Sequence, residues 1–378
     1  MRNYLKAYHV ELTTLSPVFI GDGNKIGNKE YIYLARSHRI LIPYLGRMFN
    51  ACVAKKISGE YRNYMMGEKQ PLGRWLQEQG FSEGDFEKWK KYELDAGDFF
   101  IPSNNNPGRT RPPQDIQTFV KDPYGLPYIP GSSIKGIIRT ALVIYAVKNN
   151  PAKYSSVLNK IKEQSNDKKG RKFYLAEATS DLETSVFHTL EKNEKRKADA
   201  VNSVMAGLVI SDSKPLSLSD LALCQKIDVS MDGQENRLNI LKEALKPGVK
   251  IEFDISIDET LFPYSIEEIF SALNLLNEAY YDSFCKKFDR GDPQPGIIWI
   301  VGGDGFGTKT VINALFNEDE ALTLTDKVMQ VTVDKKYTEH HHDRDRSLGV
   351  SPHVFKCTKY EGQLYDFGKA IVNGFTPI

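Results

Sequence analysis

The chain has 378 residues, 40% hydrophobic and 26% charged, which allows a large core and argues against wholesale disorder. The net charge of +1 argues against tight, non-specific binding of nucleic acid by the isolated chain. The four cysteines form no Cys-x-x-Cys pair, so neither a cysteine-based zinc site nor a disulfide framework is expected, and we expect a cytoplasmic location. The sequence contains no uninterrupted apolar run of about 18 residues, so no membrane span is predicted.

The first hundred residues predict short strands and one helix. Tyr8–Leu15 alternates apolar and polar residues, which predicts a strand, and Gly21–Asn24 is typical of a turn. Tyr31–Leu34 and Ile40–Ile42 predict two further short strands. Met48–Lys56 has a helical pattern.

Ile101–Pro113 is dense in Pro, Asn and Gly and predicts an exposed loop. It carries Arg109 and Arg111, which are candidates to clamp phosphates or to wedge into a duplex. A plain surface loop is the alternative interpretation.

The middle of the chain predicts a helix at Ile134–Lys148, with apolar residues on one face. Lys153–Lys172 holds seven basic and two acidic residues with little periodicity. This pattern indicates either a mobile or RNA-facing insertion or a solvated surface segment.

Beyond residue 200 the order strand, helix, strand begins again. Four strands are predicted there, at Ala206–Ile210, Leu221–Val229, Val249–Ile257 and Ile297–Val301. One long helix is predicted at Ile266–Phe288. We therefore predict an α+β protein of two units, residues 1–200 with the basic insertion and residues 201–378 with a glycine-rich loop.

The first candidate site is the start of the helix that follows Gly131. Gly131 allows a sharp turn, Ser132 or Ser133 can cap the helix, and a helix N-terminus suits a phosphate. Lys135 and Arg139 are four residues apart and share one helical face, which adds two cations. An ordinary capped helix with solvated basic residues is the alternative.

The second candidate site is Gly302–Thr310, directly after a predicted strand. It contains Gly302, Gly303, Gly305 and Gly307. The segment is close to a phosphate-binding P-loop, but Thr308 separates Gly307 from Lys309, so the spacing fails by one residue. A backbone cradle for RNA phosphate or a neighbouring subunit fits better than nucleotide hydrolysis, and a glycine turn for tight packing is the third interpretation.

The third candidate is the run His340–Arg346. Clustered His and Asp suggest a metal site, but adjacent residues rarely all face one ion, and no partner ligand is evident. A polar exposed loop, or a contact with RNA or a partner, is the preferred interpretation. No metal and no cofactor is predicted.

Taken together, these motifs carry a resemblance to a known family. Ile129–Arg139 and Ile297–Thr310 resemble the signature and the C-terminal glycine-rich loop of the RAMP superfamily of CRISPR proteins. Further motifs are similar to the family of the fifth subunit of the type III-A (Csm) complex: Leu15–Gly23, Ile210–Pro215, Phe306–Thr310 and Tyr365–Ala370.

The resemblance implies two tandem ferredoxin-like (RRM-type) domains with loop insertions. It also implies a non-catalytic, crRNA-binding subunit that caps the complex at the crRNA 3′ side and supports crRNA maturation in antiviral defence. The implied partners are crRNA, the RAMP backbone subunit, the small helical subunit and host nucleases for 3′ trimming. By position, Gly131–Lys135, Arg139 and Gly302–Lys309 match the family's RNA-facing loops.

One departure from an RRM is the lack of a Lys/Arg-Gly-Phe/Tyr-Gly/Ala-Phe string, so RNA binding would rest on backbone and phosphate contacts.

The alternative function is a metal-independent RNA endonuclease of the same superfamily. His9 and His38 are its candidate catalytic histidines.

Overall fold

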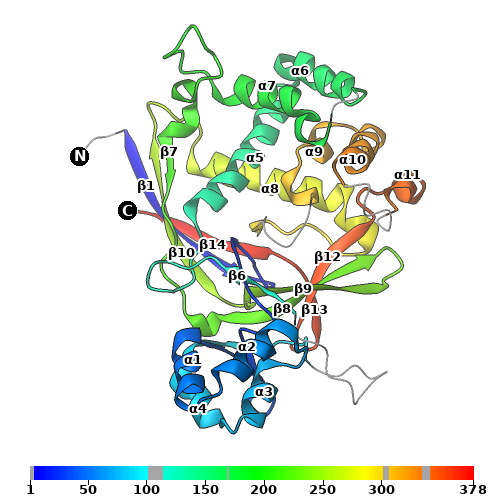
Figure 1. Ribbon diagram of the computed structural model, residues 1–378. Helices are drawn as coiled ribbons and strands as arrows, with labels where there is room; N and C mark the ends of the chain where they lie inside the picture. Colours follow the sequence, from blue (N-terminus) through cyan, green and yellow to red (C-terminus); the bar gives the residue numbers. More distant parts are fainter. Residues whose placement is uncertain (1–3, 101–113, 168–169, 301–305, 334–340) are drawn as a thin grey trace.

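The computed structural model describes residues 4–100, 114–167, 170–300, 306–333 and 341–378. Its described residues form two curled β-sheets, with one layer of helices above and a group of four helices below (Figure 1). The α+β class is confirmed, and the arrangement agrees with tandem ferredoxin-like domains with insertions.

The first sheet is antiparallel and has the N-terminal strand at its centre. In spatial order its strands are β11 (Ile297–Trp299), β14 (Lys369–Pro377), β1 (Leu5–Thr14), β10 (Lys250–Asp258) and β7 (Leu208–Ile210). One edge of β1 pairs with β10 and the other with β14, so both partners come from the second half of the chain. Val10 and Leu12 point from β1 into the main core.

The second sheet mixes the two halves of the chain in the same way. Its main path is β2 (Gly21–Ile26), β6 (Ile116–Phe119), β9 (Glu235–Leu245), β8 (Leu221–Ser230), β5 (Lys90–Asp95), β4 (Arg39–Pro43) and β3 (Ile32–Leu34). Strand β12 (Val354–Tyr360) pairs with β8 and with β13 (Gln363–Asp366). The predicted boundary at residue 200 therefore does not separate two sheets, because each sheet contains strands from both sides of it.

Two long helices form the centre of the upper layer. Helix α5 (Gly131–Asn149) packs against α8 (Ile266–Ser283), and both contribute to the core above the first sheet (Figure 1). Helix α8 begins with a capping box, in which the N–H of Glu268 donates to the Ser265 hydroxyl (3.2 Å) and the Ser265 N–H donates to the Glu268 carboxylate (2.8 Å).

Shorter helices complete the two helical groups. Those of the upper layer are α6 (Pro151–Gln164), α7 (Ala176–Phe187), α9 (Ile312–Leu315), α10 (Glu318–Thr332) and α11 (Asp345–Leu348). Those of the lower group are α1 (Leu45–Ala54), α2 (Ser58–Gly67), α3 (Leu72–Glu78) and α4 (Glu83–Trp89). The lower group has an apolar cluster of its own, packed against β3 and β4.

Most predicted strands and the three predicted helices are confirmed, two predictions are wrong, and one strand was missed. Gly21–Asn24 is an irregular part of β2 rather than a free turn. Lys153–Lys172 contains α6, which buries Tyr154 and Ile161 and is therefore not an unpacked insertion. Strand β9 was not predicted, because its first half is polar and mostly exposed. The predicted loop Ile101–Pro113 lies outside the described residues.

A fully buried carboxylate joins three strands of the second sheet. Glu243 on β9 accepts the backbone N–H of Phe119 on β6 (2.9 Å) and the hydroxyl of Tyr92 on β5 (2.5 Å). Lys121 supplies the compensating positive charge. Burial, together with the charge of Glu243, raises the pKa of Tyr92, so the phenol stays neutral and donates.

Replacing Tyr92 with Phe should therefore lower the free energy of unfolding by about 1.5–3 kcal/mol, the range for a hydrogen bond to a charged group. The matched control is Tyr124→Phe, since Tyr124 is 91% exposed and removal of its hydroxyl should leave the free energy of unfolding unchanged. Urea unfolding of the two variants checks this. Equal stabilities would show that the Glu243 cluster does not hold the sheet.

Candidate nucleic-acid interface

The start of α5 is packed against the polypeptide that leaves β7. A Cβ atom at Gly131 would lie 2.3 Å from the Ile210 carbonyl oxygen and 2.6 Å from that of Ser211. The Gly131 N–H donates to the Asp212 carboxylate (2.8 Å). Glycine is thus required here by close packing, and Asp212 takes the first free N–H of the helix.

The prediction that a serine caps α5 is wrong. Pro130 is the N-cap residue and offers no side-chain hydrogen bond, while Ser132 and Ser133 lie within the first helical turn. Proline fits this position because it has no N–H to lose and its fixed φ suits a helix start. Ser132 is exposed and Ser133 is half-buried.

Lys135 turns back onto the protein. Its ammonium group donates to the carbonyl oxygens of Met205 (2.8 Å) and Leu208 (2.6 Å), at the two ends of a short segment leading into β7. Burial lowers the pKa of Lys135, and the charge of Arg139 adds to this effect. The side chain therefore fastens α5 to the first sheet.

Arg139, one turn further on, is partly exposed, and its guanidinium also lies over the ring of Phe187 (5.8 Å to the centroid). Its guanidinium pairs with Glu183 on α7 (2.5 Å), and the two side chains are 43% and 45% exposed. Exposed ion pairs contribute about 0–1 kcal/mol, so a phosphate can replace Glu183 at little cost. Gly136 is also exposed, with no atom within 4 Å of an added Cβ, which leaves the outer face of α5 open to a ligand.

Only the end of the second glycine segment lies within the described residues, since 301–305 with Gly302, Gly303 and Gly305 fall outside them. A Cβ at Gly307 would lie 2.6 Å from the ring of Tyr280 on α8, so this glycine is needed for tight packing. Thr308 is buried, whereas Lys309 is exposed. Lys309 is thus the cation that this turn presents at the surface.

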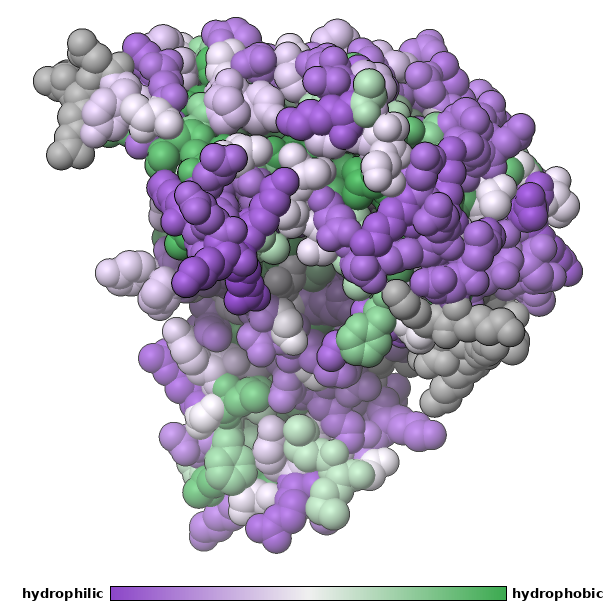
Figure 2. Space-filling view, turned by 90° about the horizontal axis from the view of Figure 1, so that it is seen from above, coloured by the Kyte–Doolittle hydropathy of each residue, from purple (hydrophilic) through white to green (hydrophobic). Residues whose placement is uncertain are grey.

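The structure brings α5 and the second segment together. Thr140 of α5, Glu183 of α7 and Lys309 line one cavity of about 290 Å³, which is otherwise mostly apolar. Arg139 is bonded to Glu183, so both cations lie close to the same cavity. Over the helical layer the surface is largely hydrophilic, with only small hydrophobic patches (Figure 2).

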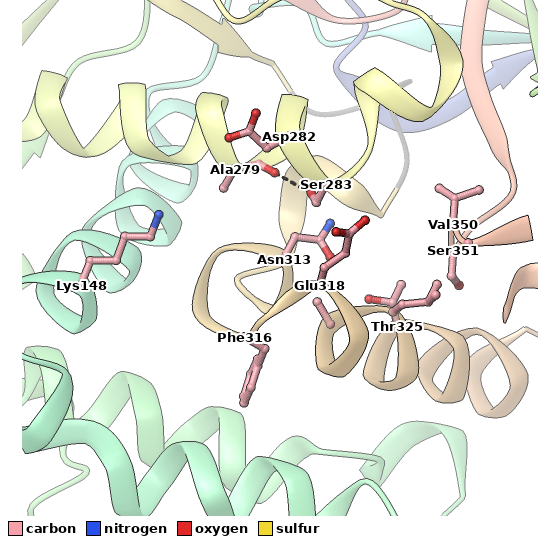
Figure 3. Close-up of a pocket in the computed structure, with 13 residues that line it drawn as sticks. Lys148, Ala279, Asp282, Ser283, Asn313, Phe316, Glu318, Thr325, Val350 and Ser351 are labelled. Atoms are coloured by element: carbon pink, nitrogen blue, oxygen red, sulfur yellow. Dashed lines mark hydrogen bonds between the residues drawn. The ribbon is translucent and has the colours of Figure 1, made fainter.

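A second cavity, of about 230 Å³, lies among α8, α9, α10 and residues 349–351 (Figure 3). Three of its polar residues are engaged with neighbours. The Ser283 hydroxyl donates to the Ala279 carbonyl (2.5 Å), Glu318 pairs with Lys287 (2.7 Å), and Asp282 with Lys286 (2.5 Å). This is the pattern of a helical junction rather than of an activated nucleophile.

The two candidate catalytic histidines lie apart, one on a strand of the first sheet and the other in the turn between β3 and β4 of the second. His9 on β1 is bonded to Asp254 (2.8 Å), with Glu252 3.7 Å away. The ring nitrogens of His38 lie 2.6 Å from the Gly97 carbonyl and 3.2 Å from the Tyr33 hydroxyl. They do not form one acid–base pair. Arg109 and Arg111 lie outside the described residues.

Two features were missed in the sequence. The exposed run 192–197 contains four basic residues beside the end of α7, and its charge density was the available signal. His342, Asp345 and His353 converge in space, so this run is not a simple exposed loop. The signal was the spacing His-x2-Asp-x7-His, which spans the end of α11.

Comparison with known proteins identifies the family. The family model for the RAMP superfamily matches residues 11–307. The chain belongs to the RAMP superfamily. The predicted resemblance to its fifth-subunit family is also confirmed, since the chain is similar to proteins called CRISPR system Cms protein Csm5.

The RAMP relative from Mycobacterium tuberculosis is 27% identical over 98% of this chain and 98% of its own length. The relative from Streptococcus thermophilus is 26% identical over 82% of each chain. Two solved structures share the fold, each with a TM-score of 0.57 and 17% identity.

One is a chain in a cryo-EM structure of a type III-A Csm–crRNA–target RNA ternary complex, and the match covers 97% of this chain and 100% of that one. The other is the crystal structure of T. onnurineus Csm5, with coverages of 96% and 99%. Among the described residues of this RAMP protein, no helix is both long and apolar enough to cross a bilayer.

The packing of α5 predicts opposite effects for its two glycines. Gly131→Ala should destabilise the fold by about 1–3 kcal/mol or more, because the new methyl group overlaps two carbonyl oxygens. Gly136→Ala should stabilise by roughly 0.4–1 kcal/mol, since the space is open and alanine favours the helix. Denaturant unfolding of both variants measures this, and equal effects would contradict the packing described for Gly131.

Proposed function

We propose that the chain is the Csm5-type subunit of a type III-A CRISPR–Cas effector complex and that it binds crRNA there. The observation that carries this proposal is the similarity over 98% of both chains to a protein called Csm5. The shared fold with a chain of a Csm–crRNA–target RNA complex supports it. The net charge of +1 fits a protein that binds RNA only within an assembly.

In finer terms, we propose a non-catalytic cap at the crRNA 3′ side, in the cytoplasm. Its protein neighbours would be the RAMP backbone subunit and the small helical subunit, and host nucleases would trim the crRNA 3′ end. The scattered positions of His9 and His38 favour positioning of RNA over cleavage. Phosphate contacts, which carry no sequence information, suit a subunit that must accept any guide.

The proposed RNA-facing surface is the outer side of α5 with the turn at 307–309. Arg139 and Lys309 are its cations, and Ser132 and Gly136 leave room for a sugar-phosphate backbone. The exposed basic run 192–197 extends the positive charge. The remaining predicted contacts stay predictions: Gly131, Ser133, Lys135, Gly302, Gly303, Gly305, Gly307, Thr308, Arg109 and Arg111.

The proposed protein interface is an apolar stripe on α1. Leu45, Phe49 and Val53 recur every four residues and are 37%, 40% and 49% exposed, while Met48 and Cys52 on the adjoining face of the helix fill the core. Contiguous exposed apolar surface marks sites of protein contact. This α1 stripe belongs to the lower helical group, at the far end of the molecule from the helical layer (Figure 1).

Co-expression tests the assembly. With a RAMP backbone subunit and crRNA, the chain should co-purify with both, whereas alone it should retain little RNA. Leu45→Asp with Val53→Lys places charges that suit the helix ends and should reduce incorporation about tenfold, equivalent to about 1.4 kcal/mol of binding free energy.

Asn50→Lys, at an exposed position on the same helix, is the control and should incorporate normally. Failure of the wild-type chain to join a complex would contradict the proposed function. Normal incorporation of the double variant would contradict only the role of the α1 stripe. Cleavage of crRNA by the purified wild-type chain would favour the endonuclease alternative.

RNA retention distinguishes the exposed cations Arg139 and Lys309 from Lys135, which is bonded to the protein. Arg139→Ala and Lys309→Ala should each weaken crRNA retention and reduce its salt dependence by the equivalent of about one phosphate contact, with little change in stability. Lys135→Ala should instead lower the free energy of unfolding by about 1–3 kcal/mol, because two carbonyl groups lose their donor.

The measurements are filter retention of labelled crRNA across a salt series and thermal unfolding of each variant. Normal retention by the Arg139 and Lys309 variants together would contradict the proposed RNA-facing surface.

A further inference from the structure

Two histidines meet at one buried carboxylate beside the end of α10. Asp345, the first residue of α11, is fully buried. Its Oδ2 lies 2.9 Å from Nδ1 of His342 and 2.6 Å from the Ser351 hydroxyl, and its Oδ1 lies 2.5 Å from Nδ1 of His353. Two histidines and one serine of the short connection between α10 and β12 thus contact the same carboxylate.

The carboxylate of Asp345 has two imidazoles and one hydroxyl as its partners. In the described part of the chain, the ion pairs of Asp345 are those with the two histidines, and no Lys or Arg pairs with it. Asp326 on α10 is also buried, and its carboxylate accepts from the Gln330 side-chain amide (2.9 Å). Buried carboxylates are stable when paired with cations or bound to metal.

The donor atoms suit a transition metal. One atom from each of His342, Asp345 and His353 lies within 4.8 Å of the others. Zinc binds imidazole nitrogen and carboxylate oxygen at about 2.0–2.2 Å, so an ion between these atoms needs only small side-chain shifts. Two imidazoles and one carboxylate match the ligand preferences of Zn²⁺ and its first-row neighbours.

The cluster is also accessible. The side chains of His342 and His353 are 12% and 19% exposed, and both line a surface cavity of about 640 Å³. Phe306, the first described residue after 301–305, also lines that cavity. An ion has an entry path there, and its fourth position can face the cavity and take water or a phosphate oxygen.

We propose that His342, Asp345 and His353 form a binding site for one divalent transition-metal ion of the zinc class. On binding, each imidazole carries its proton on Nε2 and turns the Nδ1 lone pair to the ion, and any proton displaced from Nδ1 goes to solvent. The ion links the turn before α11 to the residue that precedes β12. This site is independent of the RNA-facing surface proposed above.

Zinc uptake tests the site directly. The untagged full-length protein is stripped with a chelator, dialysed against buffered Zn²⁺, and analysed for metal by mass spectrometry. Wild type should hold one ion per chain and melt at a higher temperature with Zn²⁺ than without. His342→Gln with His353→Gln should weaken binding roughly 100-fold or more, beyond the 10–100-fold effect of losing an outer-shell partner, and should abolish the thermal shift.

His188→Gln is the matched control, because His188 lies at the end of α7 and hydrogen-bonds the Lys197 carbonyl (3.3 Å). This variant should bind like wild type. Equal zinc uptake by wild type and the double variant would overturn the proposal and leave a hydrogen-bonded cluster only.

If the double variant does not fold, Co²⁺ titration of the wild-type protein decides. Saturable d–d absorption with one equivalent, without a thiolate charge-transfer band, supports a site of nitrogen and oxygen ligands. The lack of such a spectrum overturns it.

Discussion

Strand β1 is hydrogen-bonded along both edges by strands from the second half of the chain, and the rest of the molecule is built on this constraint. Its partners β10 and β14 begin about 240 and 360 residues later, and they form the centre of the first sheet. Helices α5 and α8 cover this sheet, and β7 continues it to the point where α5 begins. Positions of functional groups on α5 therefore depend on contacts that the N-terminal half cannot make by itself.

The same dependence explains why neighbouring polar groups of α5 have different roles. Lys135 and the Gly131 N–H are bound to the segment around β7, so they hold the helix in place. Arg139 lies one turn further from the sheet, and its ion-pair partner Glu183 is half-exposed and exchangeable. A helix that is packed along one side and partly exposed at Arg139 can present this cation to a ligand without a large rearrangement.

Local sequence patterns were sufficient where local rules decide the structure. Alternation predicted β1, and the apolar stripe predicted α5, because each pattern meets one continuous core. Helix α6 was not recognised, since its few buried residues, such as Tyr154 and Ile161, are separated by lysines. No local rule indicates that Lys135 would find two carbonyl groups about 70 residues away.

For the candidate sites too, sequence patterns predicted the features that local rules decide and missed those that depend on the fold. The glycine positions were found from sequence, but their reasons differ, because Gly131 and Gly307 are required by packing against Ser211 and Tyr280. The meeting of His342 and His353 at Asp345 depends on a turn that sequence spacing alone does not define.

The central claim is that the outer side of α5 and the turn at 307–309 face guide RNA in an assembled complex. Photo-crosslinking of the reconstituted complex, followed by peptide mass spectrometry, tests it most directly. The account predicts crRNA crosslinks on peptides containing Arg139 and Lys309 and none on α1. Crosslinks confined to the lower helical group, with α5 unmodified, would contradict it.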